Sequence, residues 1–202
     1  MASKDHSLDD SIIRAATDEF MEGGYQNASV RKIAQRAGLT TGALYTRYAN
    51  KELLFCSLVE EILKEISKTL APIQQAYMNA QESGNLENIM AAIRQEEEIY
   101  LQLMFQYYDQ CVLLFCRSNG SMLREKMERM MEEKAKNTVE YLKKISKTQT
   151  DITGIEFVLS EQFHYYQKIL EKGYNKEQAY SCMKTVEEFM EAGWKALFEK
   201  IM

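Results

Sequence analysis

The chain has 202 residues, of which 46% are hydrophobic and only one is proline, so it can bury a sizeable core but lacks the turn residues of a sheet protein. Its formal net charge of −5 argues against a surface that is basic throughout. The longest apolar run, Cys111–Cys116, is too short to span a bilayer, and the polar N-terminus is unlike a secretion signal, so we expect a cytoplasmic protein.

The first four expected helices each have a recognisable start or end. The first has apolar residues at four-residue steps and stops at a pair of glycines. A second helix is predicted to begin behind Ser29 and to end at Gly38, which can adopt the left-handed conformation of a C-terminal cap. A short third helix follows Thr40, with Leu44 as its apolar anchor, and a fourth begins behind Asn50. The apolar residues of the first helix are Leu8, Ile12, Ala16 and Phe20.

The rest of the chain is predicted to be one helix after another. Pro72 is expected to end or kink the fourth helix. Further helices are expected over 86–117, with a break near 103–106, over 122–145, over 155–170, and from Asn175 to the C-terminus. Since no strand pattern is present, the predicted fold class is all-α.

Charge is unevenly distributed, and one short segment differs from the rest. From Gly24 to Lys51 the chain contains five basic residues and no Asp or Glu, while the six acidic residues of the first 51 all precede Gly24. This distribution favours a polyanionic partner that binds one small surface. The basic residues are Arg31, Lys32, Arg36, Arg47 and Lys51.

The two short helices around Gly38 form a helix-turn-helix, and the second of them has side chains that suit DNA. Thr41, Gly42 and Ala43 are small enough for the start of this helix to approach a duplex closely. A glycine inside a helix costs about 1 kcal/mol relative to alanine, and such an approach would explain Gly42. The hydroxyls of Thr40 and Thr41 and the free N–H groups of the helix N-terminus suit phosphate oxygens.

At these residues the sequence resembles a known family. The segment VRKIAQRAGLTTGALYTRYANKELL resembles the DNA-binding signature of TetR-like (tetracycline-repressor type) transcriptional regulators. The resemblance is specific over residues 8–55 and beyond them rests on length and helical pattern. The shared core, Gly-x-Leu-Tyr-x-x-aromatic-x-x-Lys, corresponds here to Gly42, Leu44, Tyr45, Tyr48 and Lys51.

The resemblance implies a three-helix N-terminal helix-turn-helix domain, residues 1–51, and a larger helical effector-binding and dimerisation domain, residues 52–202. It also implies a homodimeric repressor that binds a palindromic double-stranded DNA operator and is released by a small-molecule effector. Neither a cofactor nor an enzymatic activity is expected.

Carried over residue by residue, the resemblance implies two kinds of DNA contact. Phosphate contacts are expected from Ser29, Thr40, Thr41, Tyr45 and Lys51, and the residues nearest the base edges are Gly42, Ala43, Thr46 and Arg47. Arg47 has two open roles, bidentate pairing with guanine and phosphate binding. The full predicted set is Ser29, Arg31, Thr40, Thr41, Gly42, Ala43, Tyr45, Thr46, Arg47, Tyr48 and Lys51.

The larger domain is rich in methionine and aromatic residues, which suit an adaptable apolar cavity, although each such residue singly is more often ordinary core. We expect an apolar or aromatic effector. The predicted effector residues are Met90, Tyr100, Met104, Tyr107, Tyr108, Cys111 and Phe115. The fourth helix starts at Lys51 and runs into this domain, so it is the expected lever between effector and DNA.

The apolar stripes of the last two predicted helices are either core or dimer surface. Their aromatic content and their position at the end of the chain favour a dimer bundle. The predicted interface residues are Val158, Phe163, Tyr166, Ile169, Val186, Met190, Trp194 and Leu197.

A second class of function remains open, a helical ligand-binding or di-metal bundle protein with a purely structural N-terminal hairpin. Glu161 and His164 have the Glu-x-x-His spacing of di-iron bundles, but such a site needs a second pair and the only other histidine is His6. The four cysteines are scattered and are expected to be reduced thiols. No metal or catalytic site is therefore expected.

Overall fold

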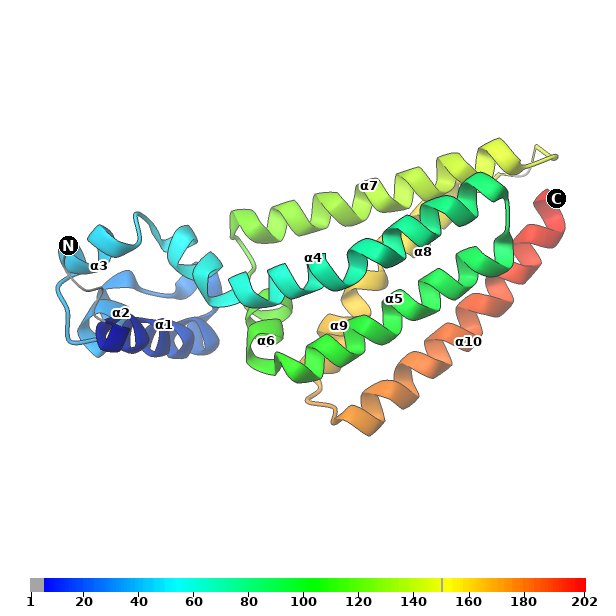
Figure 1. The fold of residues 1–202 in the computed structure, drawn as a ribbon. Helices are drawn as coiled ribbons and strands as arrows, with labels where there is room; N and C mark the ends of the chain where they lie inside the picture. Colours follow the sequence, from blue (N-terminus) through cyan, green and yellow to red (C-terminus); the bar gives the residue numbers. More distant parts are fainter. Residues whose placement is uncertain (1–5, 150) are drawn as a thin grey trace. The chain divides into compact units, whose positions relative to one another are not determined.

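The structure is a computed structural model that describes residues 6–149 and 151–202. Every regular element within these residues is a helix, which confirms the predicted all-α fold class (Figure 1). The helices form two compact units. We call them the N-terminal unit, which runs to Glu65 and includes Tyr107–Lys126, and the C-terminal unit, which comprises Ile66–Gln106 and Met127–Met202.

The N-terminal unit contains the predicted helix-turn-helix. Its helices are α1 (His6–Asn27), α2 (Val30–Arg36), α3 (Thr41–Arg47), the first part of α4 (Lys51–Ser83), α6 (Tyr108–Cys116) and the start of α7 (Met122–Ile145). The predicted glycine stop of α1 is a kink, because Gly24 has a φ of 67° and a non-helical ψ of 171°. Phe20 of α1 and Phe55 of α4 are fully buried and pack edge to face, with ring centroids 5.0 Å apart.

Local polar side chains cap three helices of this unit, α2, α3 and α4. Ser29, Thr40 and Asn50 each accept a backbone N–H of the following first turn, at 3.4, 3.1 and 2.8 Å, as predicted for N-caps. α7 begins differently, because its first N–H groups, those of Met122 and Leu123, donate to the Glu52 carboxylate at 3.2 and 3.0 Å. This cap comes from a residue 70 positions away and has no sequence signature.

The C-terminal unit contains long helices and two short ones. They are the remainder of α4, α5 (Leu86–Gln106), the remainder of α7, α8 (Thr153–Ser160), α9 (Gln162–Glu171) and α10 (Lys176–Ile201). α5 and α10 lie side by side (Figure 1). One core cluster joins Leu142 of α7 to Trp194 of α10, and another joins Leu70 of α4 to Ala92 of α5.

Of the two effects expected of Pro72, an end or a kink of the fourth helix, the end is wrong. α4 continues through Pro72 to Ser83. Proline removes one backbone hydrogen bond from a helix interior, but Leu70 and Ile73 on either side of it are buried against Ala92. Tertiary packing of this kind, more than local propensity, stabilises most protein helices.

The other helix boundaries largely follow the predicted pattern. The break expected within 86–117 lies at Tyr107, between α5 and α6. The last helix begins with the predicted Asn175 cap, which forms a capping box with Gln178. The predicted helix over 155–170 is interrupted at Glu161, which separates α8 from α9.

The predicted domain boundary between residues 51 and 52 lies in the first turn of α4. The packing units divide α4 after Glu65 and group α6 with α1, α2 and α3. Packing units and functional domains are different divisions of a chain, so the assignment of DNA binding to residues 1–51 and of effector binding and dimerisation to residues 52–202 stays a prediction.

Candidate DNA-binding interface and ligand cleft

The turn between α2 and α3 is fixed by backbone hydrogen bonds around Gly38. Gly38 has a φ of 71°, its N–H donates to Gln35 O at 3.1 Å, and the N–H of Leu39 donates to Ala34 O at 2.8 Å. This is the left-handed C-terminal cap that the sequence predicts. A Cβ at Gly38 would meet no atom within 4 Å, so the backbone conformation alone calls for glycine here.

α3 presents most of its surface to solvent. Leu44 is its buried anchor, with 1% of its surface exposed, and Thr40 caps its N-terminus through the Ala43 N–H. Thr46 donates its hydroxyl hydrogen to Gly42 O at 3.0 Å. The exposed residues of this helix are Gly42, Ala43, Tyr45, Thr46 and Arg47, and Thr41 and Tyr48 are half-buried.

Nothing inside the protein requires Gly42 to be a glycine. A Cβ built at this position would meet only the Thr40 hydroxyl, at 4.0 Å, and positive φ values occur only at glycines other than Gly42 among the described residues. The residue is exposed on the surface of α3. An external partner that approaches the backbone closely would explain the glycine.

Two acidic residues of α1 bind the basic residues of α2. The Glu19 carboxylate is only 4% exposed, accepts the Ser29 N–H at 3.0 Å, and lies 4.0 Å from Lys32 and 3.6 Å from Arg36. Arg36 also donates two hydrogen bonds to Glu22, at 2.7 and 3.3 Å. These bonds lower the pKa of Glu22 and raise that of Arg36.

The basic residues at the end of α3 and the start of α4 also have partners. Arg47 Nη1 lies 3.5 Å from Asp9 Oδ1 of α1. Lys51 donates to Gln26 O at 3.2 Å and lies 4.7 Å from the centre of the Tyr25 ring, and burial lowers the pKa of Lys51. Of the five basic residues, Lys51 is half-buried and the other four are exposed.

The cationic surface expected from the sequence is therefore partly neutralised in three dimensions. Three of its five basic residues face carboxylates of α1 that precede Gly24 in sequence. Sequence reasoning missed these acidic partners, although Glu19 gave one signal: it lies three residues after Ala16 on the apolar face of α1. An acidic residue at such a position indicates a buried ion pair.

The predicted effector residues are divided between the two units. Met90, Tyr100 and Met104 belong to the C-terminal unit, and Tyr107, Tyr108, Cys111 and Phe115 belong to the N-terminal unit. Burial raises the pKa of the Tyr100 hydroxyl and raises that of the Cys111 thiol to about 12, so both groups are neutral near pH 7.

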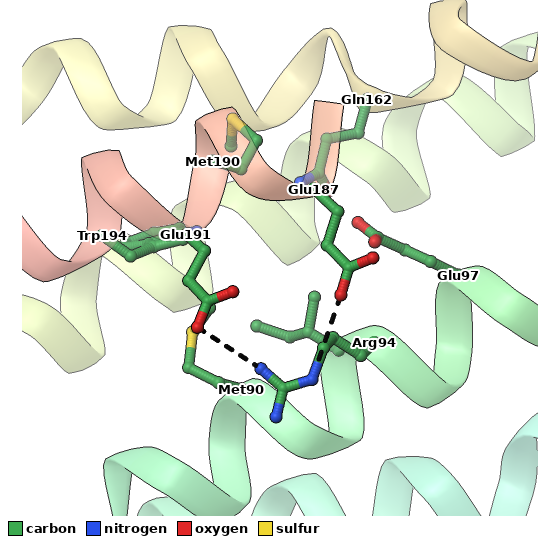
Figure 2. Close-up of a pocket in the computed structure, with 9 residues that line it drawn as sticks. Met90, Arg94, Glu97, Gln162, Glu187, Met190, Glu191 and Trp194 are labelled. Carbon is green, nitrogen blue, oxygen red and sulfur yellow. Dashed lines mark ion pairs between the residues drawn. The ribbon is translucent and has the colours of Figure 1, made fainter. Parts of the chain in front are cut away.

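A small cleft lies between α5 and α10, and Figure 2 shows its lining. Its volume of about 20 Å³ leaves room for roughly one water molecule, far less than a drug-sized ligand requires. A second cleft of similar size shares Met90, Ile93 and Trp194. The first cleft is lined by Met90, Ile93, Arg94, Glu97, Gln162, Glu187, Met190, Glu191 and Trp194.

The charged groups of this cleft come from both helices. Arg94 of α5 forms ion pairs with Glu187 and Glu191 of α10, at 4.0 and 3.9 Å (Figure 2). Burial, and then the charges of Glu187 and Glu96, raise the pKa of Glu97 to about 7. Of the predicted effector residues, Met90 lines this cleft, and Tyr100 packs on Tyr166 with ring centroids 5.4 Å apart.

Half of the predicted dimer residues are buried within the protomer. Phe163, Tyr166, Ile169 and Trp194 belong to its core, Val186, Met190 and Leu197 are half-buried, and Val158 is exposed. The large exposed apolar side chains of α8 and α10 are Phe157, at 75%, Phe189, at 79%, and Val158, at 41%. Phe157 falls outside the stripe that the sequence pattern picked out.

Glu161 and His164, the pair considered for a metal site, contact each other. His164 Nδ1 is 3.2 Å from Glu161 Oε2, and no group of three His, Cys, Asp or Glu side chains with metal-binding geometry occurs in the part of the chain that the structure describes. None of the four cysteines forms a disulfide. None of the helices in residues 6–149 and 151–202 is long and apolar enough to cross a membrane.

Comparison with known proteins gives matches over the helix-turn-helix and over the fold. Residues 12–58 match the sequence model of a family described as "Bacterial regulatory proteins, tetR family". The fatty acid metabolism regulator protein of Bacillus subtilis (strain 168) is 42% identical over 50 residues, which are 25% of this chain and 26% of that protein. The chain thus matches about a quarter of the length of this curated relative.

Solved structures match over nearly the full length. A TetR-like transcriptional regulator from Rhodococcus sp. RHA1 aligns with a TM-score of 0.58 and 14% identity over 95% of this chain and 100% of that one. NalD from Pseudomonas aeruginosa aligns with a TM-score of 0.54 and 15% identity over 98% of both chains. At these identities the likeness is one of fold. Residues 12–58, which hold the helix-turn-helix, are thus similar to the DNA-binding segment of tetR-family regulators, and the helices of the whole chain have the fold of TetR-like structures.

Proposed function

We propose that this protein is a homodimeric transcriptional repressor that binds a palindromic DNA operator and is released by a small-molecule effector. The observation that carries the proposal is α3, a capped helix behind a fixed turn whose exposed residues are small or hydrogen-bonding. Gly42 on its surface is explained by the close approach of a duplex and by nothing inside the protein. An α-helix fits the major groove of B-DNA, where base edges are distinguishable.

Substitutions at some of the proposed DNA contacts would change protein stability as well as DNA binding, and at others they would change DNA binding alone. Ser29 and Lys51 also bond within the protein, so replacing either lowers stability together with DNA binding. The Tyr45 ring is 45% exposed on α3, and it is therefore the better probe of a phosphate contact. Thr40 and Thr41 add hydroxyls at the helix N-terminus, where N–H groups favour anions.

The repressor assignment draws on relatives. NalD is described as the secondary repressor of a multidrug efflux pump, and the Bacillus subtilis relative as a regulator of fatty acid metabolism. Those properties belong to those proteins. The description of NalD supports repression as the mode of action here.

We place the effector site in the C-terminal unit, beside Met90 and Trp194, with an apolar or aromatic ligand. Because the two clefts there are each about 20 Å³, such a ligand has to part α5 from α10 as it binds. α4 contributes residues to both units and begins at Lys51, three residues after the cap of α3. It is the proposed lever, since a ligand that favours another spacing of the two recognition helices weakens operator binding.

Binding-site selection from a random duplex library tests the DNA-binding function. We expect an enriched palindrome, bound with an affinity that falls steeply with salt, and a loss of binding in Tyr45→Ala. Met130→Ala is the matched control, because Met130 is similarly exposed but lies in the C-terminal unit. If no sequence is enriched and binding stays weak at low salt, with and without candidate ligands, the helix-turn-helix is structural and the proposal fails.

The effector site has a built-in reporter. Trp194 is the only tryptophan in the chain and lines both clefts. A ligand that binds as proposed changes the tryptophan fluorescence, and Met90→Ala alters its affinity. A compound that releases DNA without any change in this fluorescence would place the effector site elsewhere.

A further inference from the structure

Within residues 6–149 and 151–202, Arg47 is held by a single ion pair, whereas Arg36 of the neighbouring helix is also hydrogen-bonded. Arg36 donates two hydrogen bonds to Glu22, at 2.7 and 3.3 Å, and lies 3.6 Å from Glu19. Arg47 lies 3.5 Å from Asp9, beyond the roughly 2.7–3.2 Å of an N–H···O hydrogen bond. The carboxylate of Asp9 therefore orients the Arg47 guanidinium and leaves its N–H groups available to a partner.

The position of Asp9 has a cost for DNA binding. Its carboxylate lies beside a residue of α3, the helix proposed to enter the major groove, where a negative charge repels phosphates. The side chains of Asp9 and Arg47 are only 26% and 28% exposed, so screening of the pair by solvent is incomplete. An acidic residue at such a place needs a role that offsets this repulsion.

We propose that Asp9 is a positioning residue for sequence recognition: it holds Arg47 so that the guanidinium reads a base edge instead of binding phosphates at random. The inference rests on the proposed DNA-binding function. An untethered arginine binds any phosphate within reach, which strengthens binding to all sequences alike. A guanidinium fixed in one direction can pair bidentately with a guanine and discriminates between base pairs.

The test compares two duplexes, the operator enriched by selection and a scrambled duplex of the same length and composition. Dissociation constants are measured at several salt concentrations for the wild type, Asp9→Asn, Arg47→Ala and the double variant. The ratio of the two dissociation constants measures specificity, a quantity that a general loss of stability does not change. Asp10→Asn is the matched control, because it removes the same charge from the adjacent, exposed residue of α1.

We expect Asp9→Asn to bind the scrambled duplex about two- to fivefold more tightly, the range that corresponds to one partly exposed ion pair. The slope of log K against log salt should steepen by about 0.9 per protomer as the freed arginine gains a phosphate contact. The specificity ratio should fall in Asp9→Asn and stay at the wild-type value in Asp10→Asn. In the Arg47→Ala background, Asp9→Asn should have no effect on the ratio, because Asp9 acts through Arg47.

Either of two results overturns the inference: Asp9→Asn behaves like Asp10→Asn, or its effect persists without Arg47. Melting temperatures are measured for each variant. If Asp9→Asn does not fold, Arg47→Lys replaces it, since lysine keeps the charge but lacks the bidentate fork. Arg47→Lys should bind the scrambled duplex with the wild-type affinity and show a lower specificity ratio than the wild type. An unchanged specificity ratio overturns the inference. A wild type without salt-dependent binding to any duplex defeats the proposed function itself.

Discussion

At the scale of single residues, Gly38 and Gly42 are close in sequence and have opposite reasons to be glycine. Gly38 has a φ of 71° that the turn requires, although a Cβ there would meet no atom within 4 Å. Gly42 lies in ordinary helical backbone on the exposed face of α3. The first glycine serves the fold and the second, on our proposal, serves the approach of DNA.

Gly42→Ala should make the protein more stable and bind DNA less well. Alanine in a helix is favoured over glycine by up to about 1 kcal/mol, and the space around a Cβ is open. On the operator the added methyl meets the duplex, and we expect a loss of affinity of about tenfold, or about 1.4 kcal/mol. Urea unfolding and operator titration measure the two effects separately. Gly38→Ala is the contrast, since it should cost about 1 kcal/mol of stability through its positive φ; unchanged operator binding by Gly42→Ala would count against close approach.

Glu97 should make stability depend on pH. Its pKa rises from 4.5 unfolded to about 7 folded, first because of burial and then because of the charges of Glu187 and Glu96. The folded state therefore binds a proton more tightly, so this contribution to stability is fully present below about pH 4.5 and is lost as pH rises to about 7. In Glu97→Gln this fall in stability should be absent, so the free energy of unfolding should change less between pH 4.5 and about pH 7 than in the wild type. Urea unfolding followed by Trp194 fluorescence measures it, and an equal pH slope in wild type and variant would contradict it.

At the scale of helices, the sequence predicts the features that depend on neighbouring residues, such as N-caps. Ser29, Thr40, Asn50 and Asn175 act as caps, as predicted, because an N-cap bonds a backbone N–H two or three residues ahead. Contacts from distant residues could not be predicted in this way. The ion pairs of Asp9, Glu19 and Glu22 with the helix-turn-helix join residues 13 to 38 positions apart. The place of Glu19 on the apolar face of α1 signals that it has a partner, but no local pattern identifies the partner residues.

The ligand cleft and the exposed apolar residues proposed for the dimer interface also depend on contacts between distant parts of the chain, so the sequence pattern predicted them only in part. The stripes of the last helices identified apolar residues correctly, but periodicity does not distinguish a face buried within the protomer from one buried by a second copy. Phe163 and Trp194 turned out to be core, whereas Phe157 and Phe189 are exposed. Met90 was the one predicted effector residue found in the lining of the cleft.

Glu52→Ala should destabilise the start of α7. Its carboxylate accepts the N–H groups of Met122 and Leu123, which a helix N-terminus otherwise leaves unpaired. Loss of such a cap costs about 1–2 kcal/mol. Urea unfolding measures the change, and faster hydrogen exchange at Met122 and Leu123 should locate it. Glu60→Ala on the same helix is the control, since its exposed pair with Lys64 is worth at most about 0.5 kcal/mol; equal effects of the two substitutions would contradict the capping role.

At the scale of the whole molecule, one helix belongs to both packing units and to both proposed functions. α4 begins at Lys51, whose ammonium group bonds the end of α1, and its later residues pack on α5 in the C-terminal unit. Regulation through α4 further requires two recognition helices with a defined spacing, and therefore two copies of the chain.

Phe157→Glu and Phe189→Glu, made singly, should each convert a dimer into a monomer. Both rings are more than 70% exposed, an unusual state for phenylalanine, and a second copy would bury them. A glutamate at either position places two carboxylates in one symmetric interface. Sedimentation at several concentrations measures the mass, and operator binding should fall together with dimerisation because a monomer engages one half-site. Met78→Glu, on an exposed methionine of α4, is the control for adding charge to an apolar surface residue. If the wild type is a monomer at all concentrations, the proposed homodimer is wrong; if both phenylalanine variants stay dimeric, the interface lies elsewhere.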